Sequence, residues 1–421
     1  MENKFTFKTL LHLLFLELLS LSPLFILLGN IIPPIPLKFH HIAFGLVFLI
    51  SFILILRDIN KRWIAYLFLF YLFFQYYLDA LDIPAIIDFF FGPFALLVMM
   101  DLVANKRLPL SNLKRYFQRF YFLLWIPMLI ALLQYIDLMP LQYWNATYVN
   151  YTVINDEAIA RSNGLLFHGS ELSVLMIMTT LLSFFYKKSH IGLIIFIFII
   201  AYTTLYKALL ISLFILILYY LFVLKKDIVS WWWKNAKHYI ILFSAIIIFL
   251  LLKISYDYFK TINTLSGYFF VPEILTGRGT IWNIYIDAIK EFSNLKIAVG
   301  NGIGSAKALF RDYATTENFA VLRSDPKSEI AYDTHNTLLS IFVNSGLVGI
   351  VFFTYLLYVF YKKNMKSTPS LNWNKRAFIA VIIIPLLTIG MTIPIFKMAI
   401  YWSSLCFIFF KWNHFRQSFD Q

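Results

Sequence analysis

A histidine and an asparagine, His335-Asn336, stand directly before a long apolar run that begins Thr-Leu-Leu-Ser-Ile-Phe-Val. The run has the length of a helix, so the pair lies at its N-terminal end, where free N–H groups and the helix dipole create positive potential. Positive potential disfavours imidazolium, which leaves the ring able to accept a proton. We therefore expect His335 to act as a general base on a hydroxyl group, with Asn336 beside it as a substrate-binding residue. The alternative is a histidine that only caps the helix or lies among lipid headgroups.

Arg278 is the best candidate for binding an anion. It lies between Gly277 and Gly279, just before a predicted helix, and glycine lets the backbone approach a ligand closely. A guanidinium group presents a planar fork of donors that matches phosphate oxygens. We expect Arg278 to stabilise a phosphate group during catalysis. The alternative is an arginine that simply faces water.

Arg161 and Lys207 are isolated cations at the predicted outer ends of two helices. Charges at the membrane edge are costly and are candidates for function, so we expect both to bind substrate. Placement among headgroups is the alternative. Glu171 and Glu17 are candidate partners for such cations. We predict a substrate-binding role for Glu171 and a structural partner for Glu17, because Glu17 lies in the middle of the first helix.

The sequence predicts no metal site and no cofactor. The two adjacent histidines His40 and His41 are expected to point apart, and Cys406 is the single cysteine. The spacing Gly300-x-Gly-x-Gly304 lacks the last glycine and the strand–helix context of a dinucleotide-binding motif. We interpret it as a turn.

These residues belong to a strongly apolar chain. Its 421 residues are 60% hydrophobic and 14% charged, with a mean hydropathy of +0.74, against about 45–50% apolar and about 25% charged in soluble domains. Since a span needs roughly 20 mostly apolar residues, we predict an all-α integral membrane protein with one polytopic domain, 1–421. About twelve spans are expected, at 8–31, 41–56, 62–80, 84–101, 118–138, 171–187, 190–205, 207–224, 238–255, 337–361, 377–393 and 396–410.

The net charge of +14 reflects the predicted membrane topology. Lysine and arginine gather in alternate connections, at 57–62, 106–119, 187–188, 225–237 and 362–376. This is the bias that places basic connections in the cytoplasm, so both termini are expected there. The same distribution argues against a nucleic-acid partner.

Two outer connections are long, a smaller loop at 139–170 and a large loop at 256–337. Within the large loop, residues 280–292 have apolar side chains at helical spacing on one face. We predict a helix lying at the membrane surface, with Trp282 as a substrate-binding residue. The apolar face consists of Ile281, Ile284, Tyr285, Ala288, Ile289 and Phe292.

An ordered set of motifs resembles the O-antigen ligase/polymerase superfamily over roughly residues 160–360. The set is Arg161-Ser-Asn-Gly-Leu-Leu-Phe, Tyr206-Lys207-Ala-Leu-Leu, Gly277-Arg278-Gly-Thr-Ile-Trp282, Gly300-Asn-Gly-Ile-Gly304, and His335-Asn336-Thr-Leu-Leu with Gly346-Leu-Val-Gly349. The resemblance implies metal-independent, inverting glycosyl transfer from an undecaprenyl-pyrophosphate-linked glycan at the periplasmic face of the bacterial inner membrane. Arg278 would hold the pyrophosphate and His335 would be the base. The family commonly has Ser-Arg where this chain has Tyr206-Lys207, which replaces a bidentate fork by a single ammonium group.

Polymerase and ligase share this donor chemistry and differ in the acceptor. The run from Arg161 to Leu172, with its Ser170-Glu171 pair, favours a polymerase of O-antigen or capsule repeat units. A ligase that transfers the glycan to lipid A–core is the alternative. A transporter of the lipid-linked sugar is a third reading, disfavoured because the polar residues lie at the outer edge rather than the midplane. Besides the donor and membrane lipids, the expected partners are a chain-length regulator or the lipid A–core acceptor.

Overall fold

The computed structural model describes most of the membrane bundle and the later part of the large outer loop. The described residues are 6–31, 38–77, 82–105, 108–136, 138–139, 151–154, 157–160, 163–166, 169–184, 196–197, 199–201, 204, 207–224, 278–321, 333–365 and 376–417.

The bundle is built from apolar helices, as the hydropathy predicts. Among the described residues, four helices are long and apolar enough to cross a membrane, and the pair α1 and α2, bent by 54°, adds a fifth if it is counted as one span. The expected spans at 190–205 and 238–255 fall largely or wholly outside the described residues, so the total of twelve stays a prediction. The helices are α1 (Phe7–Ser20), α2 (Ser22–Ile31), α3 (Phe39–Leu56), α4 (Arg62–Tyr77), α5 (Ile83–Ala104), α6 (Leu110–Tyr135), α7 (Gly169–Phe184), α9 (Lys207–Tyr219) continued by a π-helical turn (Tyr220–Leu224), α15 (Thr337–Met365), α17 (Ile384–Leu387) after a π-helical turn (Ile379–Ile383), and α18 (Ala399–Gln417).

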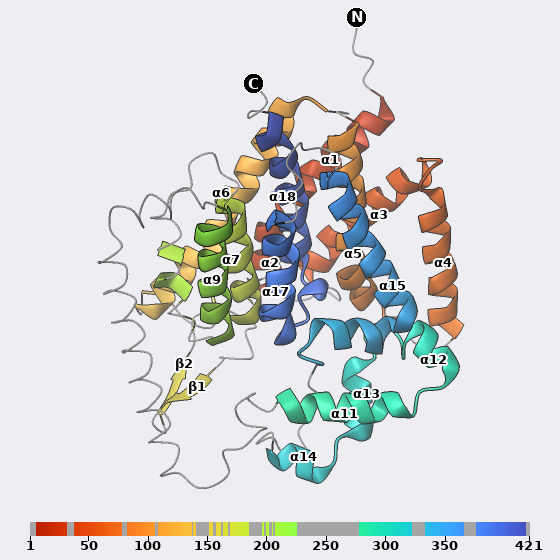
Figure 1. Cartoon of the computed structure of the whole chain (residues 1–421), viewed down its shortest axis with the longest axis vertical. Helices are drawn as coiled ribbons and strands as arrows, with labels where there is room; N and C mark the ends of the chain where they lie inside the picture. The colour runs from red at the N-terminus through yellow and green to blue at the C-terminus, as the bar shows by residue number, and fades with distance from the viewer. Residues whose placement is uncertain are drawn as a thin grey trace, which may run out of the picture.

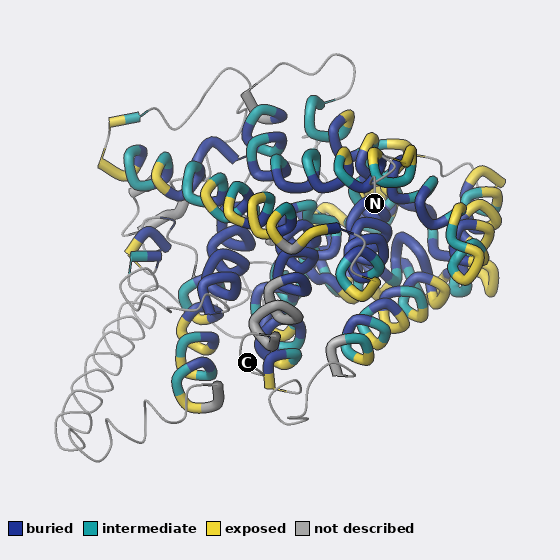
Figure 2. Tube along the Cα trace, turned by 90° about the horizontal axis from the view of Figure 1, so that it is seen from above, coloured by how far each residue is buried: buried dark blue, intermediate teal, exposed yellow. Residues whose placement is uncertain are grey.

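Helix α5 is the centre of the bundle and packs against α3 and α18. Its side chains are buried around most of its circumference, and Figure 2 shows the buried segments surrounded by more exposed ones. Gly92 of α5 lies directly against the indole of Trp402 in α18, closely enough that a Cβ at Gly92 would overlap the ring. The Trp402 Nε1 donates a hydrogen bond to the Phe396 carbonyl at 2.8 Å. This contact fixes the segment that precedes α18.

Glu17 finds a structural partner, as predicted. Its carboxylate accepts a hydrogen bond from the Arg119 guanidinium of α6 at 2.6 Å, and the same guanidinium contacts Ser20.

Four short helices lie at the end of the bundle opposite the start of α1 and the end of α18 (Figure 1). They are α11 (Arg278–Lys290), α12 (Asn294–Val299), α13 (Ala306–Tyr313) and α14 (Thr316–Val321). The predicted helix at 280–292 is confirmed, and its predicted apolar face is largely buried. That face packs against α13 and Val343 of α15, forming a separate small core. The apolar face is therefore covered by protein rather than by lipid.

Helix α15 turns sharply at Gly346, which has φ 59° and ψ −155°. A Cβ there would lie 2.5 Å from the Ala298 carbonyl of α12, and residues other than glycine rarely adopt this conformation. The Asn301 N–H also donates to the Val343 carbonyl at 2.8 Å. The bend lets the first part of α15 run across the end of the bundle (Figure 1).

One feature departs from the all-α prediction. Residues Tyr151–Ile154 (β1) and Glu157–Ala160 (β2) form a two-stranded antiparallel hairpin in which Tyr151 pairs with Ala160. It lies within the predicted smaller outer loop.

The contact between Gly92 and Trp402 makes the first testable prediction. Gly92→Leu should lower the free energy of unfolding by about 1–3 kcal/mol, because a buried indole has no room to move aside. Thermal unfolding of the purified protein in detergent measures this change. Gly45→Ala is the control, since a Cβ at Gly45 meets only the end of the flexible Ile87 side chain, at 3.3 Å. Equal stability of the two variants would contradict the packing.

Candidate active site

The candidate base lies in a short non-helical turn, residues 333–336, that leads into α15. His335 has φ 47°, a conformation that non-glycine residues adopt only rarely. The next residue caps the helix, since the Asn336 side-chain oxygen accepts the Leu339 N–H at 3.0 Å. This side-chain cap of α15 therefore comes from Asn336, and the base role of His335 stays a prediction. The predicted substrate-binding role of Asn336 remains a prediction, beside this observed structural role.

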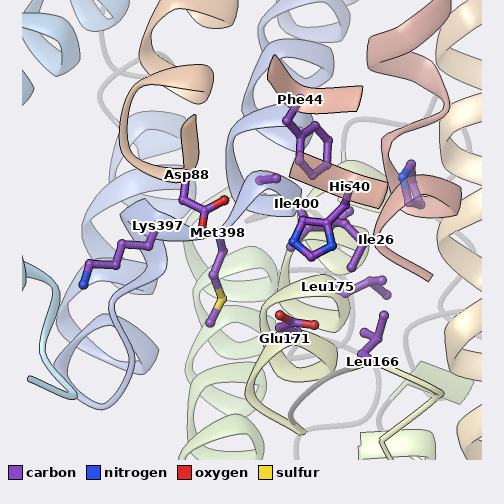
Figure 3. A pocket seen from close by; sticks show the side chains of 12 residues that line it. Ile26, His40, Phe44, Asp88, Leu166, Glu171, Leu175, Lys397, Met398 and Ile400 are labelled. Atoms are coloured by element: carbon purple, nitrogen blue, oxygen red, sulfur yellow. The ribbon is translucent and has the colours of Figure 1, made fainter. Parts of the chain in front are cut away.

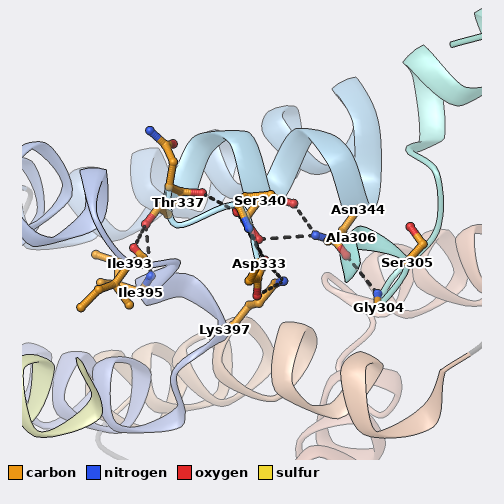
Figure 4. Close-up of polar contacts among 12 residues, drawn as sticks. Gly304, Ser305, Ala306, Asp333, Thr337, Ser340, Asn344, Ile393, Ile395 and Lys397 are labelled. Atoms are coloured by element: carbon orange, nitrogen blue, oxygen red, sulfur yellow. Dashed lines mark hydrogen bonds and ion pairs between the residues drawn. The ribbon is translucent and has the colours of Figure 1, made fainter. Parts of the chain in front are cut away.

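A break in the last helical hairpin holds this turn in place. Between α17 and α18 the chain forms two 3-10 turns, Ile389–Met391 and Ile395–Lys397. The Thr337 hydroxyl donates to the Ile393 carbonyl at 2.8 Å and accepts the Ile395 N–H at 3.1 Å (Figure 4). One side chain thus bridges two backbone groups of the break, which also bond each other at 2.9 Å.

An ion pair joins the same two segments. The Lys397 ammonium lies 3.2 Å from Asp333 Oδ1 and 3.1 Å from Oδ2 (Figure 4), and both side chains are less than one-third exposed. Burial alone would raise the pKa of Asp333, but Lys397 and the Thr334 N–H outweigh it and hold the pKa below its ordinary value. Asp333 is therefore a carboxylate at neutral pH, two residues before the candidate base.

The imidazole of His335 is held by the break as well. A ring N–H donates a hydrogen bond to the Thr392 backbone carbonyl, and this bond favours the protonated ring. Such a bond uses the N–H of one ring nitrogen and fixes the tautomer, leaving the other nitrogen to accept a proton. The pKa of His335 lies below its ordinary value, chiefly because the ring is buried. The lowered pKa was expected, but burial, rather than the helix end, is its main cause.

Arg278 lies near enough to this ring to affect its charge. Its guanidinium lowers the pKa of His335, and so does the Lys397 ammonium. Arg278 begins α11 and is only partly exposed, so it is not a fully solvated loop residue. The structure thus brings together two residues that are 57 positions apart and that the sequence assigned to one site.

Trp282 follows Arg278 by one helical turn and lies on the same side of α11. Its indole Nε1 is buried, and among the described residues it has no hydrogen-bond partner. Leaving a buried donor unpaired costs about 1–3 kcal/mol. A ligand oxygen would remove that cost, which agrees with the substrate-binding role predicted for Trp282.

Glu171 lines a cavity of about 80 Å³ between α2, α3, α7 and the start of α18. Figure 3 shows its carboxylate on one side of the cavity and Asp88 and His40 on others. Lys397 also lines this cavity, with its ammonium directed away toward Asp333. Glu171 therefore lines the same cavity as the lysine that pairs with Asp333.

The two adjacent histidines do not point apart as expected. Their ring centroids are 4.2 Å apart, and the His41 Nε2 lies 3.5 Å from the Asp88 carboxylate. Candidate ligand atoms of His40, His41 and Asp88 lie within 4.8 Å of one another. The first turn of α3 therefore gathers more polar atoms than the sequence indicated.

Two predicted cations cannot be placed. Arg161 lies outside the described residues, and Lys207 begins α9 with its side chain outside them. Their substrate-binding roles stay predictions. Sequence reasoning also missed Lys397 and Asp333. Lys397 carried the signal used for Arg161 and Lys207, an isolated cation between apolar segments, and Asp333 was close to His335 in the chain.

We call α11–α14 the outer helices. An apolar groove of about 600 Å³ opens beside them. It lies between α4, α5 and the part of α15 that follows the bend, and Val299 and Ser345 line its outer part. Aromatic side chains make up much of its wall, including Trp63, Phe70 and Tyr355.

Apolar helices that carry a partly buried arginine and an oriented histidine at one end define a membrane protein with a polar site at its rim. The family model described as O-antigen ligase matches residues 191–354, which include both Arg278 and His335. The match confirms the resemblance to the O-antigen ligase/polymerase superfamily, a family of membrane glycosyltransferase-like enzymes. No curated protein matches the chain.

The hydroxyl of Thr337 provides a test of how the break is held. Thr337→Val keeps the shape of the side chain but leaves the Ile395 N–H and the Ile393 carbonyl without this partner, so stability should fall by about 1–3 kcal/mol. Thr179→Val is the matched control, because the buried Thr179 hydroxyl bonds the Leu175 carbonyl of its own helix, at 2.7 Å, and among the described residues it joins no second segment. Thermal unfolding of both variants in detergent is the measurement. A Thr337 variant no less stable than the Thr179 variant would show that the bonds do not hold the break.

Proposed function

We propose that this chain is a glycosyltransferase that polymerises O-antigen or capsule repeat units from undecaprenyl-pyrophosphate-linked donors. One observation carries the proposal: Arg278 lies within electrostatic reach of a His335 ring whose tautomer is fixed by Thr392. A proton acceptor and a phosphate-binding cation at one site are what glycosyl transfer from a diphosphate requires.

The proposed step uses His335 as the base. The free nitrogen of the imidazole takes the proton of an acceptor hydroxyl while that oxygen forms a bond to the anomeric carbon of the donor sugar. The bond from the anomeric carbon to the pyrophosphate oxygen breaks, and the leaving group keeps the electron pair. Attack from the side opposite the leaving group inverts the anomeric centre. The lowered pKa of His335 keeps the ring unprotonated near neutral pH, ready to act.

Arg278 is the proposed partner of the leaving group. The negative charge that develops on the pyrophosphate is stabilised by the guanidinium fork. Trp282, one turn further along α11, offers a buried indole N–H to a substrate oxygen. Arg161 and Lys207 are proposed to steer the donor, and Glu171 to bind the sugar of one substrate.

The apolar groove suits the polyprenyl part of the donor. Its wall is almost entirely apolar, and its outer part reaches Val299 and Ser345, close to the bend in α15. A chain lying there keeps its hydrocarbon out of water while the diphosphate reaches the outer helices. We assign the end with α11–α14 to the periplasm of a bacterial inner membrane and both termini to the cytoplasm, because the basic connections lie on the side of the termini.

A ligase is the second candidate, favoured by the description of the matching family model as O-antigen ligase. Its acceptor would be lipid A–core. The Ser170-Glu171 pair supports the polymerase.

The assay supplies purified protein with a single lipid-linked repeat unit, with and without lipid A–core. A ladder of products supports the polymerase, and one transfer to the core supports the ligase. Formation of neither product would contradict the proposed function, and movement of the intact lipid-linked unit across vesicles would indicate transport.

Two variants test the residue roles in that assay. His335→Ala should lower turnover about 10²- to 10⁴-fold, the usual contribution of a general base. Arg278→Lys should lower turnover at least about tenfold, because the ammonium lacks the bidentate fork. Arg311→Lys is the control, since Arg311 lies on the exposed side of α13. Full activity of His335→Ala would exclude the base role.

A further inference from the structure

We propose that Lys397 is a positioning residue for His335, acting through Asp333. In this proposal the ion pair anchors the turn that carries the imidazole and sets the balance of charge around the ring. The proposal rests on the proposed function for its catalytic meaning, but its physical content is testable without turnover.

The contacts show that the turn is held at three successive points. Asp333 pairs with Lys397, His335 bonds the Thr392 carbonyl, and Thr337 bonds both Ile393 and Ile395. The four partner residues come from one segment, the break between α17 and α18. Because His335 has φ 47°, its backbone needs support from both sides. The ion pair supplies that support on the N-terminal side.

Among the described residues, three charged groups act on the imidazole, and they come from three different parts of the fold. They are Asp333 on its own turn, Lys397 in the break and Arg278 at the start of α11. Asp333 raises the pKa of His335, whereas Lys397 and Arg278 lower it. Lys397 has a second effect, because its charge compensates that of Asp333 at a distance of 3.1 Å.

Each variant should therefore change the pKa of His335 in its own direction. Lys397→Met removes a positive charge and exposes the imidazole to the full charge of Asp333, so both effects raise the pKa of His335. Asp333→Asn removes the negative charge and lowers that pKa. The double variant Asp333→Asn/Lys397→Met removes both charges, keeps the volume of the pair and should return the pKa toward that of the original protein.

A purely structural role predicts a different pattern. The pKa of His335 is lowered chiefly by burial, so a variant that only loosens the turn exposes the ring and raises the pKa. Loosening would move both single variants upward. The direction seen for Asp333→Asn therefore separates the two explanations.

The experiment measures the pH dependence of His335 modification by diethyl pyrocarbonate in the full-length protein, quantified by mass spectrometry of the peptide that contains it. The reagent attacks only the unprotonated ring, so its rate follows the pKa. We expect shifts of about one pH unit, upward for Lys397→Met and downward for Asp333→Asn. Lys397→Arg should behave as the original protein, because it retains the charge.

The same variants are then compared in the transferase assay. The rising limb of the kcat profile should move in the same directions as the modification curve. Upward shifts in both single variants, or no shift in either, would overturn the positioning role. If the pH dependence of His335 modification shifts as expected but none of the proteins transfers sugar, the effect of Lys397 and Asp333 on His335 is supported and the proposed function is contradicted.

Discussion

The structure depends on satisfying the backbone of a helix that is broken at the outer rim of the bundle. A buried backbone N–H or carbonyl without a partner costs about 1–3 kcal/mol, so a broken helix needs partners from neighbouring segments. Here the partners come from the turn before α15: Thr337 supplies both a donor and an acceptor, and Asp333 pairs with Lys397. The break in turn offers the Thr392 carbonyl to His335. The contacts between the turn and the break therefore also orient the imidazole of His335.

The outer helices carry Arg278, the second residue of the candidate site, to the region of His335. The packing of α11 on α13 and on Val343 of α15 fixes Arg278 at the beginning of α11. Because α15 bends at Gly346, its first part packs against the outer helices and its second part packs in the bundle. The site therefore lies where the small core of α11 and α13 meets the core of the bundle, and it is not a feature of one loop.

Much of this was predictable from the sequence, because apolar patterning reports burial directly. The apolar face of residues 280–292 was identified residue by residue from its spacing, and Arg278 and His335 were assigned to one site. What covers that face was not predictable, since a helical pattern shows that a face is buried but not whether protein or lipid covers it. The number of spans and the roles of Arg161 and Lys207 remain predictions.

The missed features share a physical cause. Lys397 and Asp333 are 64 positions apart, and no local pattern reports an ion pair of that separation. The proximity of His40 and His41 depends on side-chain rotamers at the start of α3, which adjacency in the sequence does not determine. The close approach at Gly346 has the same cause, because the Ala298 carbonyl that leaves no room for a side chain there belongs to another helix.

The central claim is that a diphosphate leaving group binds at Arg278, facing the imidazole of His335. A structure of the protein with undecaprenyl pyrophosphate bound tests it most directly. The account predicts the diphosphate in contact with the Arg278 guanidinium, on the side of the His335 ring away from Thr392. A diphosphate bound elsewhere on the bundle, contacting neither residue, would contradict it.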